Sequence, residues 1–139
     1  MNNHLIKKYN VTGSNYSCYP EPPYWNKKLI SIKDWQNSVK TTFDKTNHPN
    51  GISIYIHLPF CETLCTYCGC NNRITANHKV ETKYIAAIHK EWKMYLDIFN
   101  TTPHIREIYI GGGTPTFFSP ENLKKLILGI TSTAVVLES

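Results

Sequence analysis

The stretch that decides the fold is Tyr55-Ile56-His57-Leu58-Pro59-Phe60-Cys61-Glu62-Thr63-Leu64-Cys65-Thr66-Tyr67-Cys68-Gly69-Cys70. It begins as an alternating apolar strand and continues into a short loop that holds four of the five cysteines. Cys61, Cys65 and Cys68 have C-x3-C-x2-C spacing, and Cys70 follows two residues later. Thiolates this close together are costly unless they are paired, bind a metal or take part in redox chemistry.

The spacing of these cysteines leaves three interpretations. Disulfides form mainly in oxidising compartments, whereas the polar segment Met1 to Lys8 lacks the apolar core of a secretory signal. Structural zinc usually needs a second pair of ligands, but Cys18 is isolated and the histidines are scattered. An iron–sulfur cluster is favoured, because thiolates on one loop are its usual ligands, and zinc is the main alternative.

The apolar residues predict alternating strands and helices. Ile52 to Leu58 alternates apolar and polar side chains, as a strand does, and Ile105 to Ile110 is a second strand. Val80 to Phe99 has apolar residues at spacings of three and four, which is typical of a helix. A last helix begins with Ser119 as N-cap and Pro120 at N1. This order predicts a parallel βαβ unit at the start of a (β/α) barrel, whose ligands bind after the strand C-termini.

The residues before the first strand predict an arm and a helix. Residues 1–28 are rich in aromatics and turn residues, so we expect an extended arm that packs on the core or acts as a lid. Ser31 to Lys45 is expected to be a helix with Ser31 as N-cap. We divide the chain into residues 1–50 (arm and helix) and 51–139 (start of an incomplete core domain). The apolar stripes expected to be buried in the first and last helices are Ile32, Trp35, Val39 and Phe43, and Leu123, Leu126, Ile127 and Ile130.

Two further features of the sequence indicate where a ligand would bind. Tyr55 and His57 lie on the polar face of their strand, so both are candidates for the inside of a barrel. A hydrogen-bonded core histidine is the other interpretation of His57. Gly111-Gly112-Gly113 lacks the spacing of a dinucleotide site or a P-loop, and alone it signals a turn. After a strand, it would let the backbone approach a ligand closely, because no Cβ intervenes.

The sequence also resembles a known family. C-x3-C-x2-C is the signature of the radical S-adenosylmethionine (SAM) superfamily. Within it, three stretches resemble the oxygen-independent coproporphyrinogen III oxidases: Tyr55 to Cys61, Cys68-Gly69-Cys70-Asn71, and Gly111-Gly112-Gly113-Thr114-Pro115-Thr116. Lys8-Tyr9-Asn10, Gly13 and Tyr16 to Pro20 resemble the family's N-terminal segment, although the family usually has Ser or Asp at Cys18. The resemblance reaches about Thr133.

The resemblance implies a radical SAM enzyme of porphyrin biosynthesis. Cys61, Cys65 and Cys68 are then ligands of a [4Fe–4S] cluster, and Cys70 is not. One electron cleaves SAM, and the resulting radical starts the decarboxylation of two propionates of coproporphyrinogen III to give protoporphyrinogen IX. The sequence identifies neither the electron donor nor a catalytic side chain. The residues implied to contact SAM are Tyr55, Tyr67, Gly112, Gly113 and Thr114.

Composition excludes other classes. The 139 residues are 18% charged and 41% hydrophobic, which fits one domain and excludes a membrane protein. The net charge is +5, but only Arg73 and Arg106 among the 15 basic residues are arginines, so we expect a solvated lysine-rich surface. We therefore expect a cytoplasmic monomer without a nucleic-acid or membrane partner.

The family is much longer than this chain. We expect only about two barrel strands to be complete, although Thr131 to Ser139 could begin a third. The expectation is an incomplete fragment, from a truncated or frame-disrupted gene, that is inactive by itself. The alternatives are a relative of the haem chaperones, which typically have Asp-Phe where Gly69-Cys70 stands, a zinc-binding interaction module, or a gene remnant.

Overall fold

The computed structural model describes residues 3–10, 30–48 and 50–138. The chain forms two compact units, Met1–Ile30 and Ser31–Ser139. The first contains the helix α1 (Asn3–Tyr9), so part of the segment expected to be an extended arm is helical. The rest of that arm, with its possible lid role, Cys18 and the family-like segment around it, lies outside the described residues.

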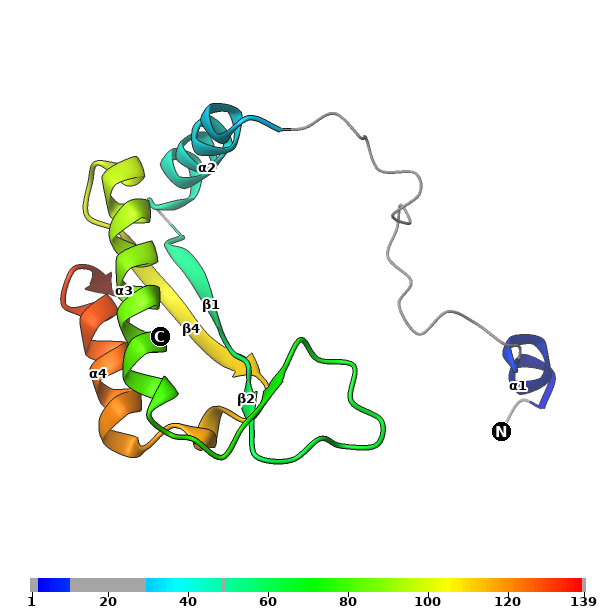
Figure 1. The fold of residues 1–139 in the computed structure, drawn as a ribbon. Coiled ribbons are helices and arrows are strands. Elements are labelled where there is room, and N and C mark those ends of the chain that lie inside the picture. Colours follow the sequence, from blue (N-terminus) through cyan, green and yellow to red (C-terminus); the bar gives the residue numbers. More distant parts are fainter. Residues whose placement is uncertain (1–2, 11–29, 49, 139) are drawn as a thin grey trace. The chain divides into compact units, whose positions relative to one another are not determined.

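The second unit is a parallel α/β structure (Figure 1). Its main sheet has the strand order β1-β4-β5, and both pairs are parallel. The strands expected at 52–58 and 105–110 and the helix expected at 80–99 are confirmed, and β5 supplies a short third strand. The elements are α2 (Ile32–Thr46), β1 (Ile52–Leu58), β2 (Phe60–Cys61), β3 (Arg73–Ile74), α3 (Val80–Phe99), β4 (His104–Gly112), the 3-10 turn η2 (Pro115–Phe117), α4 (Pro120–Thr131) and β5 (Val135–Val136).

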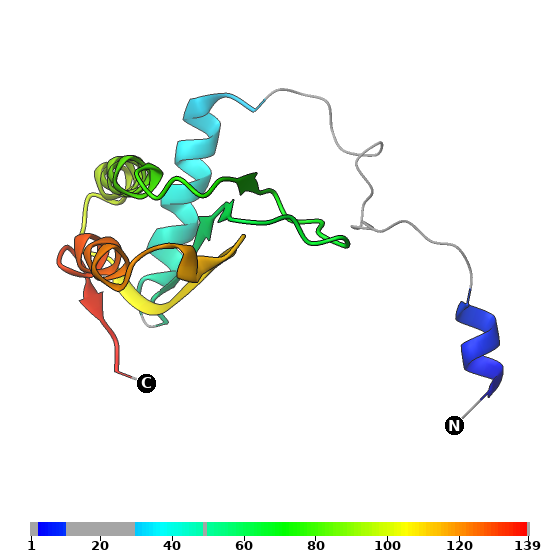
Figure 2. The same cartoon turned by 60° about the horizontal axis from the view of Figure 1, so that its bottom comes forward.

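One face of the sheet is covered by helices. Figures 1 and 2 show α3 and α4 side by side along it. Apolar side chains of β1 and β4 pack there against those of the two helices, and Leu58, Ile105 and Leu126 are at most 1% exposed. The opposite face carries Tyr55 and Tyr109, which are 57% and 62% exposed. The expected start of a (β/α) barrel is therefore confirmed, with helices outside and an open inner face. Among the described residues, no helix has the length and apolar character needed to cross a membrane.

Helix α2 packs on α3 through two aromatic side chains, Trp35 near its start and Phe43 near its end. The Phe43 ring stacks on Phe99 with centroids 3.9 Å apart, and Trp35 meets Tyr95 edge-on at 5.7 Å. Ile32, the first residue of α2, is 76% exposed, and Trp35 is 39% exposed despite its contact with Tyr95. The expectation that these two residues are buried is therefore wrong.

The caps of α2 and α4 are as expected, but one residue of the α4 stripe is not. Ser31 accepts a hydrogen bond from the Asp34 N–H, and Ser119 accepts one from Asn122. Leu126 and Ile130 are buried, whereas Ile127 is 37% exposed. Consecutive helical residues point about 100° apart, so Ile127 cannot share the centre of the stripe with Leu126. The expected burial of Ile127 is therefore wrong.

Candidate functional site

The cysteine loop (residues 61–72) is closed at its base by β2 and β3, which pair in parallel. The Arg73 N–H donates to the Pro59 carbonyl at 2.7 Å, and the Thr75 N–H donates to the Cys61 carbonyl at 2.9 Å. Figure 1 shows the loop projecting from the C-terminal end of β1. The sequence did not predict this pair, because strands of two residues are too short to show a period of two.

Each cysteine is held differently. Cys61 lies in β2, whereas Cys65 and Cys68 are joined by a turn in which the Cys68 N–H donates to the Cys65 carbonyl at 3.1 Å. The Asn72 amide donates to the Cys68 sulfur and to the Cys70 carbonyl, both at 3.1 Å. All four cysteines of the loop are free thiols. The loop therefore offers sulfur ligands that are not used in disulfides.

The glycine turn packs directly against this loop. The Gly113 N–H donates to the Leu58 carbonyl at 2.8 Å, and the Thr114 N–H donates to the Phe60 carbonyl at 3.0 Å. Gly112 has a φ of +111°, and a Cβ there would lie 2.9 Å from the His57 ring. The missing Cβ thus makes room for atoms of the chain itself, which the sequence did not predict.

A pocket of about 570 Å³ lies between the cysteine loop and the glycine turn. It brings together seven of the eight residues proposed from sequence, and Tyr67 is 90% exposed. Tyr55 is not in its lining. The seven are Cys61, Cys65, Tyr67, Cys68, Gly112, Gly113 and Thr114.

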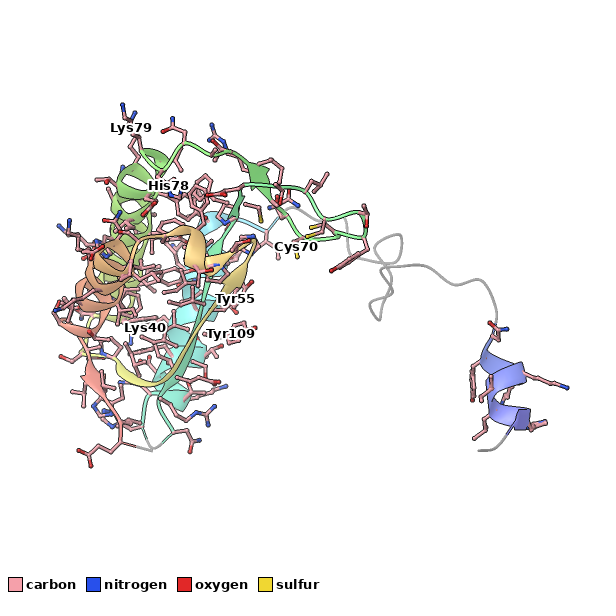
Figure 3. The ribbon with its side chains drawn as sticks, turned by 90° about the horizontal axis from the view of Figure 1, so that it is seen from below. Lys40, Tyr55, Cys70, His78, Lys79 and Tyr109 are labelled. Carbon is pink, nitrogen blue, oxygen red and sulfur yellow. The ribbon has the colours of Figure 1, made fainter. Side chains whose placement is uncertain are left out.

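Tyr55 lies instead on the open face of the sheet, beside Tyr109 (Figure 3). Their rings stack with centroids 5.7 Å apart. His57 bridges Tyr55 and the loop, with 3.1 Å from Nδ1 to the Tyr55 hydroxyl and 2.8 Å from Nε2 to the Asn71 carbonyl. A carbonyl only accepts, so Nε2 carries the proton and Nδ1 accepts from Tyr55 in the neutral ring. His57 is therefore a hydrogen-bonded link between β1 and the cysteine loop.

The donor chemistry of the pocket fits an iron–sulfur cluster, because thiolates are the usual ligands of such clusters. Within the described residues, no three Cys, His, Asp or Glu side chains surround one point as a single metal ion requires. A cluster presents several irons at separate corners, so its ligands need not converge on one point. Charge repulsion from the Cys68 sulfur and a hydrogen bond with it raise the pKa of the Cys70 thiol.

Sequence reasoning missed a buried acid below the loop. Glu81 is only 2% exposed, and it accepts hydrogen bonds from the Ser119 N–H at 3.0 Å and the Asn122 amide at 2.7 Å. Burial alone would raise the pKa of the Glu81 carboxyl, but hydrogen bonds from Asn122, Ser119 and His78 lower it overall. A Glu in the first turn of a helix usually stabilises the helix dipole from an exposed position. Nothing in the sequence therefore indicated that Glu81 is buried.

Comparison with known proteins identifies the family, although no family model matches the chain. The oxygen-independent coproporphyrinogen III oxidase of Mannheimia haemolytica is 32% identical over 124 residues, which are 88% of this chain and 80% of that protein. The chain belongs to the oxygen-independent coproporphyrinogen III oxidase family.

Other members of the oxidase family are longer. The oxidase of Helicobacter pylori is 32% identical over 128 residues, which are 90% of this chain and 27% of that protein. The oxidase of Pseudomonas aeruginosa is 32% identical over 123 residues, 88% of this chain and 26% of its own length. This oxidase-family chain thus spans about a quarter of the length of these relatives.

A solved structure supports the fold of the oxidase-family chain. Coproporphyrinogen III oxidase from Escherichia coli, described as a radical SAM enzyme, matches with a TM-score of 0.70 and 23% identity. The match covers 97% of this chain and 28% of the other. The expected fold, an incomplete radical SAM barrel, agrees with this match.

Proposed function

We propose that this chain forms the cofactor-binding part of an oxygen-independent coproporphyrinogen III oxidase, a radical SAM oxidoreductase of porphyrin biosynthesis. The observation that carries the proposal is the pocket in which the three spaced cysteines face the glycine turn. Family membership supports it, because the relatives carry the name of that enzyme. Residues 51–139 carry the core in this proposal, and residues 1–50 supply the arm and helix.

Cys61, Cys65 and Cys68 are the proposed cluster ligands. Each thiolate offers one anionic sulfur, and three sulfurs leave one corner of a [4Fe–4S] cluster without a protein ligand. When bound, the cluster supplies the electron for reductive cleavage of SAM. The Asn72 amide helps to hold Cys68, because it donates to that sulfur at 3.1 Å.

Gly112, Gly113, Thr114, Tyr67 and Tyr55 are the proposed SAM contacts. The N–H groups of Gly113 and Thr114 are already bonded to carbonyls of the chain. The Thr114 carbonyl accepts from the Phe117 N–H at 2.9 Å, and the Thr114 hydroxyl donates to the Cys61 sulfur at 3.4 Å. A carbonyl oxygen has two lone pairs, so the carbonyls of Gly113 and Thr114 are the groups proposed to accept a hydrogen bond from an ammonium group such as that of SAM.

The two tyrosines contact SAM from different sides in this proposal. Tyr67 does so from the tip of the cysteine loop, where it is 90% exposed. Tyr55 does so from the open face of the sheet, outside the lining of the pocket. That face supports a binding role, because Tyr55 is 57% exposed there.

The substrate in this proposal is coproporphyrinogen III, and an electron donor is required as partner. The protein acts as a cytoplasmic monomer without nucleic-acid or membrane partners. This stretch alone is expected to bind the cluster but not to decarboxylate the substrate. Radical abstraction requires close positioning, and a misplacement of about 1 Å can cost roughly 100-fold in rate. The open inner face of the sheet supplies only part of the necessary walls.

The test is anaerobic reconstitution with iron and sulfide, followed by iron and sulfide analysis and a visible spectrum. The wild type and Cys70→Ala should hold a cluster, whereas Cys61→Ala, Cys65→Ala and Cys68→Ala should not. One tight zinc per chain with no cluster obtainable would favour the zinc module instead. An anaerobic assay with reductant, SAM and coproporphyrinogen III should give no protoporphyrin; turnover like that of a full-length relative would contradict the expected inactivity.

A further inference from the structure

One imidazole joins the cysteine loop to the base of the helices. His78 Nε2 lies 3.3 Å from Oε1 of Glu62, the residue directly after Cys61. His78 Nδ1 lies 2.8 Å from Oε1 of the buried Glu81. A neutral imidazole has a single N–H, so hydrogen bonds to both carboxylates require the protonated ring. The hydrogen bond to Glu81 raises the pKa of His78. Partial burial acts against this rise, and the hydrogen bond to Glu62 adds to it.

The helix end of this connection is firmly held. Glu81 Oε2 accepts hydrogen bonds from the Ser119 N–H and the Asn122 amide, which ties the start of α3 to the first turn of α4. The His78 ring also stacks on Phe117 with centroids 4.2 Å apart and planes 14° apart. Phe117 is 5% exposed and belongs to the lining of the pocket. His78 is therefore fixed on two sides, and its third contact is Glu62.

The loop end of the connection is exposed. The side chains of His78 and Glu62 are 51% and 62% exposed. An exposed pair of this kind adds little to the stability of a fold. The pair instead fixes the position of the loop segment that carries the Glu62 carboxylate. His57 makes the equivalent contact near the other end of the loop, through the Asn71 carbonyl.

We propose that His78 is a positioning residue that ties Glu62, and with it Cys61, to the joined first turns of α3 and α4. The cysteine loop is then held near both ends by a histidine, by His78 at Glu62 and by His57 at Asn71. The role of this tie in cluster retention rests on the proposed function. The contact between His78 and Glu62 does not rest on the proposed function, because residues of this chain form it by themselves.

The test uses Glu62→Ala, which removes the exposed carboxylate and leaves Glu81 and the core intact. In the cluster-free chain, the alkylation rate of Cys61 should rise about twofold to fivefold, the range expected for loss of an exposed ion pair. Loss of the reconstituted cluster to a chelator should accelerate by a similar factor. Alkylation is followed by mass spectrometry that assigns the label to Cys61 among the four cysteines of the loop.

Three further variants separate positioning from general destabilisation. Glu62→Gln keeps an oxygen that accepts from Nε2–H and should restore most of the wild-type rates. His78→Asn places an amide near the former Nδ1, so it satisfies Glu81, cannot reach Glu62, and should behave like Glu62→Ala. Glu121→Ala is the control, since this exposed side chain makes no hydrogen bond or ion pair with any residue that the structure describes. It should leave both rates unchanged.

Two outcomes would overturn the proposal. One is an alkylation rate of Cys61 that is the same in Glu62→Ala and the wild type. The other is an equal rise in Glu121→Ala, which would show a nonspecific effect of charge. If the wild type binds no cluster at all, the proposed function fails, while the alkylation rates still decide whether the tie exists.

Discussion

Gly113 packs directly against Cys61, because a Cβ built at position 113 would lie 2.8 Å from the Cys61 sulfur. Two motifs more than 40 residues apart in the sequence are therefore one structural unit. The glycine is required for the placement of the cysteine loop even before any ligand binds.

Gly113→Ala should displace the loop and weaken the fold. The added Cβ would also lie 2.8 Å from the Phe60 carbonyl and 2.9 Å from a backbone carbon of Pro59, and backbone cannot move aside cheaply. Overpacking of this kind costs about 1–3 kcal/mol. Denaturant unfolding and iron content per chain are the measurements. Gly111→Ala is the comparison, because its nearest atoms belong to the exposed rings of Tyr109 and Tyr55, and its effect should be smaller.

Asn72→Ala should make the cluster easier to lose without unfolding the chain. The Asn72 amide donates to both the Cys68 sulfur and the Cys70 carbonyl. Losing hydrogen bonds to a metal ligand typically costs about 10–100-fold in metal affinity. Iron release to a chelator measures the effect, and an unchanged release rate would show that the contact has no role. Asn37→Ala is the control, since Asn37 is exposed on α2 and lies outside the loop.

Phe43→Ala should detach α2 from α3. Phe43 is 3% exposed and stacks on Phe99, and truncation of a buried Phe costs about 3–5 kcal/mol. Ile32→Ala, in the exposed first turn of the same helix, should change the free energy of unfolding by less than about 0.5 kcal/mol. Urea unfolding of both variants gives the comparison. Equal effects would mean that the helix contact extends over the first turn.

The free energy of unfolding should depend on pH through His78 and Glu81. The pKa of Glu81 lies below its ordinary 4.5, so its contribution is full above that value and is lost as the pH falls through the lowered pKa. The pKa of His78 lies above its ordinary 6.5, so its contribution is full below that value and is lost as the pH rises through the raised pKa.

Denaturant unfolding across this range would test the assignment. The wild type should lose stability as the pH rises above about 6.5, and His78→Asn should lose that part of the dependence. Parallel curves for the two proteins would assign the dependence to other groups.

Much of the fold could be predicted from periodicity. The strand at Ile52 to Leu58 and the helix at Val80 to Phe99 have the bounds expected from sequence, because both carry long, regular apolar patterns. Ile32, Trp35 and Ile127 were wrongly expected to be buried. A helical pattern shows which side is apolar, but not how far along the helix its neighbour extends.

The candidate site was predictable only in part. The C-x3-C-x2-C spacing and the three glycines are local signals, and the pocket brings most of the residues named from them together. The chain from Glu62 through His78 to Glu81 was not predictable, because its contacts join a loop to the start of two helices. No period or spacing in one sequence encodes such a meeting of distant polar groups.

Because the base of the cysteine loop is closed, changes within the loop during evolution are independent of changes in the sheet. The hydrogen bonds from Arg73 to Pro59 and from Thr75 to Cys61 keep the two ends of the cysteine loop together. The entropic cost of closing such a loop grows slowly, by about 0.6 kcal/mol for each doubling of its length. Insertions between Cys70 and Asn72 would therefore leave the pairing of β1 with β4 unaffected. The loop can diversify while the sheet beneath it keeps its register.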